Sequence, residues 1–165
     1  MRAPRSVGLA WVGRSAAALL MGLLALVPGV AWLSQGRLDD ASYAFAQGDC
    51  RGAASAARRS ISLLGNRADA YEILGYCDIR SGRPGAALAA ITKASSLDPE
   101  NWNYTYDLAL ARAAAGLDPR AVATKALMLN PLQPLVQDEW QTFRRGNPST
   151  WPTDARTIAS KFDTL

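Results

Sequence analysis

The chain opens with an apolar run that no charged residue interrupts, over residues 15–33. Nineteen residues at about 1.5 Å per helical residue nearly match a hydrocarbon core about 30 Å thick. We therefore predict a transmembrane helix over residues 15–33, preceded by a basic segment over residues 1–14. Arginines cluster before the run and not after it, so we expect the amino-terminus inside and the rest of the chain outside a bacterial cytoplasmic membrane.

Two alternatives to this anchor stay open. The small residues Gly29, Val30 and Ala31 follow the turn-prone Pro28, as at the cleavage site of a signal peptide. The apolar run is longer than an ordinary signal core and continues past that site, which favours an uncleaved anchor. A buried helix of a globular domain is the third interpretation, although an uncharged stretch this long leaves no polar face for water.

The remainder of the chain repeats at a fixed interval. Glycines recur every 34 residues, an alanine follows each of them five positions later, and a second set of small residues keeps the same step: Gly48, Gly82 and Gly116; Ala53, Ala87 and Ala121; Ala41, Gly75 and Ala109. A period of 34 with small residues at fixed offsets is typical of helix–turn–helix repeats, in which each hairpin buries its apolar face against the next.

The middle repeat, residues 68–101, resembles the tetratricopeptide repeat family. It carries the pattern of that family at these positions: Tyr71, Leu74, Gly75, Gly82, Ala87, Ile91, Ala94 and Pro99. The third repeat keeps part of the pattern and reaches Pro131 two residues early, and the first has Asp40 where an apolar residue is expected and Gly65 in place of the closing proline. The resemblance covers about residues 35–131.

This resemblance implies an all-α fold, with about three helical hairpins of an α-solenoid after the transmembrane helix. We expect helices near residues 36–47, 50–64, 67–81, 84–97, 101–115 and 118–129. Residues 132–165 are expected to form capping helices, because the open end of a repeat stack needs a cover. Their apolar positions are Leu135, Val136, Trp140 and Phe143, and then Ile158, Phe162 and Leu165.

The concave face of such a stack is lined by the first helix of each hairpin, and this is where we expect a protein or peptide partner to bind. Spacing of three and four residues places a mixed set of side chains there: Phe45, Asp69, Glu72, Tyr76, Ile79, Arg80, Asn103, Tyr106 and Leu110. Ser42 extends the face from the first repeat. The alternative is that these are ordinary solvated residues. The predicted function is that of a membrane-anchored protein–protein interaction scaffold.

A narrower resemblance concerns residues 94–134. This stretch is similar to the helical-repeat tail of bacterial O-antigen ligase-like and polymerase-like membrane proteins. It implies a second function, an accessory subunit of a cell-envelope polysaccharide enzyme. The many-helix membrane domain of those proteins is absent here, so their enzymatic activity does not carry over.

Composition argues against most enzyme classes and against nucleic acid. The chain has no histidine and two cysteines, so it lacks the common proton shuttle, and we expect no cofactor and no metal. A hydrolase using Asp69 and Glu72 is a third alternative, which we disfavour because two acids on a helix face are more simply solvated. The net charge of +4 includes three arginines before residue 15, and the rest of the chain is nearly neutral.

The two cysteines, Cys50 and Cys77, are predicted at a similar height on neighbouring antiparallel helices. A disulfide between them is possible in an oxidising exterior. Two buried thiols that pack as small apolar side chains are the favoured alternative.

Overall fold

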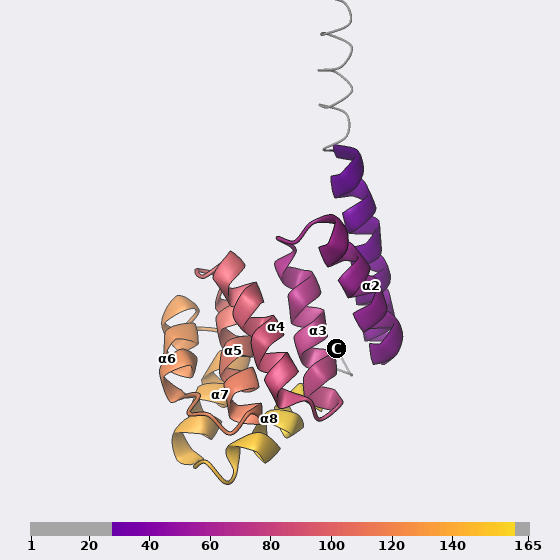
Figure 1. Cartoon of the computed structure of the whole chain (residues 1–165). Helices are drawn as coiled ribbons and strands as arrows, with labels where there is room; N and C mark the ends of the chain where they lie inside the picture. Colours follow the sequence, from indigo (N-terminus) through magenta and orange to yellow (C-terminus); the bar gives the residue numbers. More distant parts are fainter. Residues whose placement is uncertain (1–27, 161–165) are drawn as a thin grey trace, which may run out of the picture.

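The computed structural model describes residues 28–160, and all regular structure within them is helical (Figure 1). A first helix covers residues 28–46 and is called helix 28–46 below. Seven further helices follow: α2 (Cys50–Leu63), α3 (Ala68–Arg80), α4 (Pro84–Leu97), α5 (Trp102–Ala114), α6 (Arg120–Leu129), α7 (Pro134–Arg145) and α8 (Trp151–Ser160). The prediction of an all-α repeat structure is confirmed, with the predicted repeat helices within a few residues of their observed bounds, except at the start of helix 28–46.

The helices stack in chain order. Each of α2 to α6 packs against the next helix along the chain, so the hairpins lie side by side in Figure 1. Alanine dominates the contacts, with Ala53, Ala57, Ala87 and Ala109 fully buried. Small side chains let the helices approach closely, and no hairpin could bury its apolar face alone.

The glycines that define the period close the hairpin turns. Gly48, Gly82 and Gly116 have φ of 74°, 67° and 71°, the left-handed region in which a side chain is unfavourable. In each turn the residue after the glycine donates a backbone hydrogen bond to the carbonyl five positions earlier, and these bonds are 2.8–2.9 Å long. This is the bond that ends a helix at a left-handed glycine. The period of 34 is therefore a period of turns as well as of packing.

Gly75 shows why one position of the repeat must be small. A Cβ atom placed on Gly75 would collide with the side chain of Ile91, which is buried between α3 and α4. Ala41 and Ala109, one period away on either side, are also buried.

The prediction of a transmembrane helix over residues 15–33 is wrong for the part of the chain that the structure describes. Within residues 28–160, no helix is both long enough and apolar enough to cross a bilayer. Residues 1–14 and 15–27 lie outside the described residues. Residues 28–33 belong to a helix that runs to residue 46 and includes the charged residues Arg37, Asp39 and Asp40.

The physical reason is that helix 28–46 is amphipathic and belongs to the first hairpin. Its Leu38 and Ala41 are buried against α2 and α3. The hydroxyls of Ser34 and Ser60 are buried between helix 28–46 and α2. Each donates to the backbone carbonyl of the other serine, at 3.1 and 2.9 Å. Trp32, by contrast, is 76% exposed. Residues 28–33 are exposed or half-buried, and the buried contacts of this helix lie after the apolar run.

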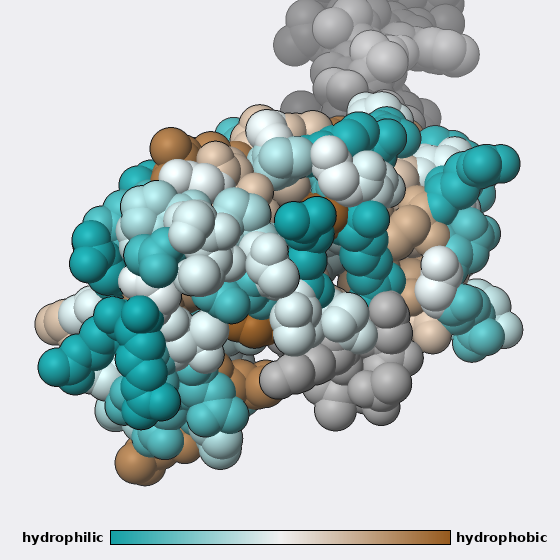
Figure 2. All heavy atoms as spheres, turned by 90° about the horizontal axis from the view of Figure 1, so that it is seen from below, coloured by the Kyte–Doolittle hydropathy of each residue, from teal (hydrophilic) through white to brown (hydrophobic). Residues whose placement is uncertain are grey.

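The last two helices differ in where they pack. α7 packs against α6 and continues the stack, whereas α8 turns back and packs against α5 and α3 (Figure 1). There Trp151, Ala155 and Ala159 join one core cluster with Ile79 and Leu110. Seen from below, polar residues cover most of this end of the molecule and apolar residues form small separate patches (Figure 2). Phe162 and Leu165 lie outside the described residues.

Candidate binding site

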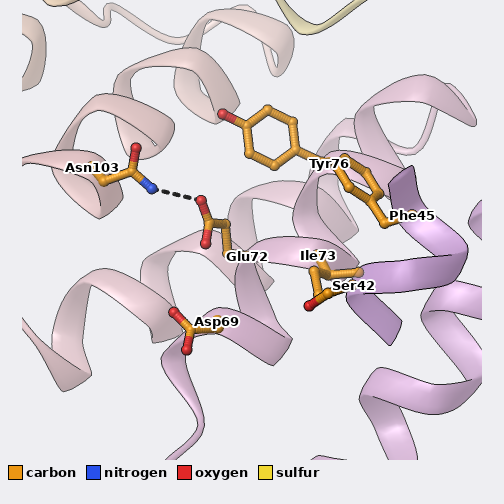
Figure 3. Close-up of a pocket in the computed structure, with 7 residues that line it drawn as sticks. All are labelled: Ser42, Phe45, Asp69, Glu72, Ile73, Tyr76 and Asn103. Atoms are coloured by element: carbon orange, nitrogen blue, oxygen red, sulfur yellow. Dashed lines mark hydrogen bonds between the residues drawn. The ribbon is translucent and has the colours of Figure 1, made fainter. Parts of the chain in front are cut away.

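A cavity of about 420 Å³ opens between helix 28–46, α3 and the start of α5. It lies on the side formed by the first helices of the hairpins, which is the predicted concave face. Seven residues line it, and they are drawn in Figure 3: Ser42, Phe45, Asp69, Glu72, Ile73, Tyr76 and Asn103. In that view the two carboxylates lie on one side of the cavity, and the two rings with Ile73 lie on the other.

Side chains of α5 hold both carboxylates of the cavity in place. Asn103 Nδ2 donates to Glu72 Oε1 at 2.7 Å, and the Tyr104 hydroxyl donates to Asp69 Oδ1. Asn101 caps α5 by accepting a hydrogen bond from the Asn103 backbone at 3.0 Å, which fixes the first turn of that helix. The two acids are therefore oriented before any ligand arrives.

A buried acid lies behind this wall of the cavity. The Tyr76 hydroxyl donates to Asp107 Oδ1, and Asp107 is 1% exposed. Burial raises the pKa of the Asp107 carboxyl well above its usual range, and the nearby charge of Glu72 raises it further. Burial also raises the pKa of Glu72, against the hydrogen bond from Asn103, which lowers it. Negative charge on these two neighbours is thus costly unless a cation compensates it.

The opposite wall is aromatic. The Phe45 and Tyr76 rings lie 6.0 Å apart between centroids and are tilted by 47°, a favourable arrangement for two rings. The Arg80 guanidinium lies 4.4 Å from the Phe45 ring centroid, and its Nη1 donates to Cys50 Sγ at 3.8 Å. Phe45 is therefore held between α3 and the cavity.

The structure joins Cys50 and Cys77 in a disulfide, with Cα atoms 5.2 Å apart. Cys50 begins α2 and Cys77 lies in the last turn of α3, the similar height expected from the sequence. The favoured alternative of two free thiols is thus not what the structure has. The bond fixes the first hairpin to the helix that carries Glu72 and Tyr76.

The structure brings together part of the predicted face and buries another part. Phe45, Asp69, Glu72, Tyr76 and Asn103 meet around the cavity. The other three non-basic positions lie elsewhere in the core: Ile79 and Leu110 under α8, and Tyr106 against Ala126 and Val136. Arg80 lies beside α8 as well as on Phe45.

The division arises because α8 covers half of the predicted helix face, which helical periodicity does not reveal. Tyr104 and Asp107 were not predicted, although Asp107 follows Asn103 by four residues on α5 and so lies one turn further along the same side. Glu139 of α7, buried near Asp107, had no signal in the sequence.

Within residues 28–160, no three or more carboxylate, thiol or imidazole side chains are placed to hold a metal ion. The hydrolase alternative for Asp69 and Glu72 stays a prediction. So do the envelope location, the membrane-associated partner and the narrower resemblance to O-antigen ligase tails.

No protein-family model matches the chain, and no curated protein sequence matches it. A solved structure of a mutant O-GlcNAc transferase from Thermobaculum terrenum is similar to it, with a TM-score of 0.66 over 79% of this chain at 23% identity. The chain spans 25% of the length of that protein. At this identity the similarity concerns the fold, and together with the helical hairpins it gives a tetratricopeptide-like helical repeat.

Proposed function

We propose that this protein is an interaction scaffold that holds a segment of a partner protein in the cavity between helix 28–46, α3 and α5. The observation that carries the proposal is the division of the concave face. The half formed by the carboxy-terminal ends of α3 and α5 is covered by α8. The half formed by their amino-terminal ends is open and lined by rings, carboxylates and an amide.

The lining of this cavity suits a protein segment. The half-buried Phe45 ring, backed by the buried Tyr76 ring, offers an apolar contact whose side chain loses little conformational entropy on binding. Asp69 and Glu72 are already oriented by hydrogen bonds from α5, so binding does not have to order them. Stacked hairpins commonly present such concave binding surfaces.

The proposal includes no catalytic step. The sequence has no histidine to move protons near neutral pH. Both cavity carboxylates accept hydrogen bonds from side chains of α5, which fixes their positions. Carboxylates held in this way can accept from a hydrogen-bond donor or pair with a cation of the partner.

The proposal is tested by site-specific photo-crosslinking in the source cells. A photoreactive residue replaces Ser42, which is exposed at the rim of the cavity, and in a matched variant it replaces Met128 of α6, which is 77% exposed. We expect Ser42 to capture a defined protein that Met128 does not, and the capture to fall when Asp69 is changed to Arg. Equal capture at both positions, or no effect of Asp69→Arg, would contradict the proposal.

A further inference from the structure

Among residues 28–160, the charged side chains that line the cavity are both acidic. They are Asp69 and Glu72, and no lysine or arginine of this part of the chain joins them. Arg80 contacts the lining at Phe45, where its guanidinium lies over the ring. The arginine that precedes α3, Arg67, is directed away, since it donates to Ser34, Gln35 and Ala31 of helix 28–46.

A buried acid, Asp107, lies behind the cavity next to Glu72. Asp107 Oδ1 accepts the Tyr76 hydroxyl, whereas Oδ2 has no donor among the amide, hydroxyl and basic groups of residues 28–160. Asp107 and Glu72 interact directly, and Glu72 forms the cavity wall in front of it. Burial raises the pKa of both Glu72 and Asp107, so ionising this pair is unfavourable, and a positive charge brought next to Glu72 would lower that cost.

The remaining lining fits the rest of a long cationic side chain. Ile73 and the Phe45 ring supply apolar contact for a methylene stem, and ring faces attract an ammonium or guanidinium group. Arg80 on Phe45 demonstrates this contact within the same chain. A bare metal ion is a poorer fit, because the described carboxylates are not grouped to coordinate one.

We propose that the cavity lined by Asp69, Glu72, Phe45 and Tyr76 recognises the cationic side chain, lysine or arginine, of the partner segment. The inference rests on the proposed scaffold function and specifies its partner chemistry. The charged head pairs with Asp69 and Glu72, and the stem lies along Ile73 and the rings.

The test is a titration of the isotope-labelled full-length chain with short peptides, followed by NMR. Four acetylated and amidated pentapeptides carry lysine, arginine, glutamine or glutamate between alanines. The Asn103 side-chain amide, which donates to Glu72, is a direct reporter of the cavity. We expect the lysine and arginine peptides to shift this resonance, with binding about tenfold or more stronger than that of the glutamine peptide. The shift should weaken as salt is added.

Three variants separate recognition from folding. Asp69→Asn and Glu72→Gln remove a charge but keep the oxygen that accepts from Tyr104 or Asn103, so the fold should persist. Asp138→Asn is the matched control, since Asp138 is exposed on α7 and outside the cavity. Each cavity variant should weaken the lysine peptide about tenfold, and the control should leave it unchanged.

The outcomes distinguish this inference from the scaffold function. Equal binding of all four peptides at Asn103, or full affinity in Asp69→Asn and Glu72→Gln, would overturn the cationic preference and leave the scaffold intact. A free butylammonium ion binding as well as the lysine peptide would show a site for small amines and overturn the peptide assignment. Absence of any peptide shift, together with no capture at Ser42, would overturn both.

Discussion

The two halves of the concave face are built from the same two helices, α3 and α5, but one half is open and the other is covered. The amino-terminal halves of α3 and α5 present Asp69, Glu72 and Asn103 and remain open. Their carboxy-terminal halves present Ile79 and Leu110, which α8 covers.

The difference shows that the type of side chain decides which part of the concave face another helix of the same chain covers. Each large apolar side chain removed from water stabilises the fold by about 1.5–3 kcal/mol, which is enough to draw α8 back over the stack. Covering the acidic half would instead bury two carboxylates without a compensating positive charge, at a cost of several kcal/mol. That half is therefore left to solvent or to a ligand of opposite charge.

The largest expected effect is in the covered half. Trp151 is 3% exposed and anchors α8, so Trp151→Ala should lower the free energy of unfolding by roughly 3–5 kcal/mol. Urea denaturation followed by circular dichroism measures it. Trp32→Ala, at a side chain that is 76% exposed, is the control and should change stability by less than ~0.5 kcal/mol. Equal effects of the two substitutions would show that α8 contributes little to the fold.

The open half is stabilised by the disulfide that joins α2 to α3. It joins residues 27 apart in the sequence, and reduction should cost roughly 3–4 kcal/mol because the unfolded chain regains the freedom that the loop had removed. Urea denaturation with and without a reductant tests this. The double variant Cys50→Ser/Cys77→Ser should start less stable and not respond to the reductant. A wild-type protein that is equally stable in both conditions would contradict the prediction.

A third prediction concerns Glu139 of α7, which is 2% exposed. Neither of its carboxyl oxygens has a hydrogen-bond partner among residues 28–160. Burial, and then the charge of Asp107, raises the pKa of Glu139 well above its usual value of 4.5. Glu139→Gln should therefore stabilise the protein at pH 7 by roughly 1–3 kcal/mol.

The sign of the pH dependence follows from the raised pKa. The folded state holds the proton of Glu139 more tightly than the unfolded chain does, so its favourable contribution is complete below about pH 4.5 and is lost as pH rises through the folded pKa. The gap in stability between Glu139→Gln and wild type should thus widen above pH 4.5, by at most ~1.4 kcal/mol per pH unit. A gap that narrows with rising pH in urea titrations would contradict the assignment.

The smallest expected effects come from matched hydroxyl changes in the two halves. Ser42 is exposed at the open cavity, so Ser42→Ala should change stability by less than ~0.5 kcal/mol. Ala155 of α8 is fully buried, so Ala155→Ser should cost roughly 1 kcal/mol by placing a hydroxyl in an apolar core. Thermal unfolding of both variants compares them. A larger loss for Ser42→Ala would mean that the open half is packed and not available to a ligand.

The site could be predicted in part. Periodicity placed Asp69, Glu72 and Tyr76 on one face, because positions three and four apart on a helix share a side. It could not show that Ile79 and Leu110 would be covered, since the covering helix comes some forty residues or more later in the chain. The apolar run misled for a different reason: its last residues, 28–33, belong to a helix that goes on through charged residues and packs on α2 through Leu38 and Ala41.

The sequence by itself determined the local plan: helical hairpins, their 34-residue period and the glycine turns at Gly48, Gly82 and Gly116. These depend on backbone conformation and on contacts between neighbours in the chain, which short-range spacing encodes. The tertiary structure alone decided that α8 folds back over one half of the concave face and that Asp107 and Glu139 are buried as acids. Burial depends on what a distant segment covers, and no residue specifies that alone.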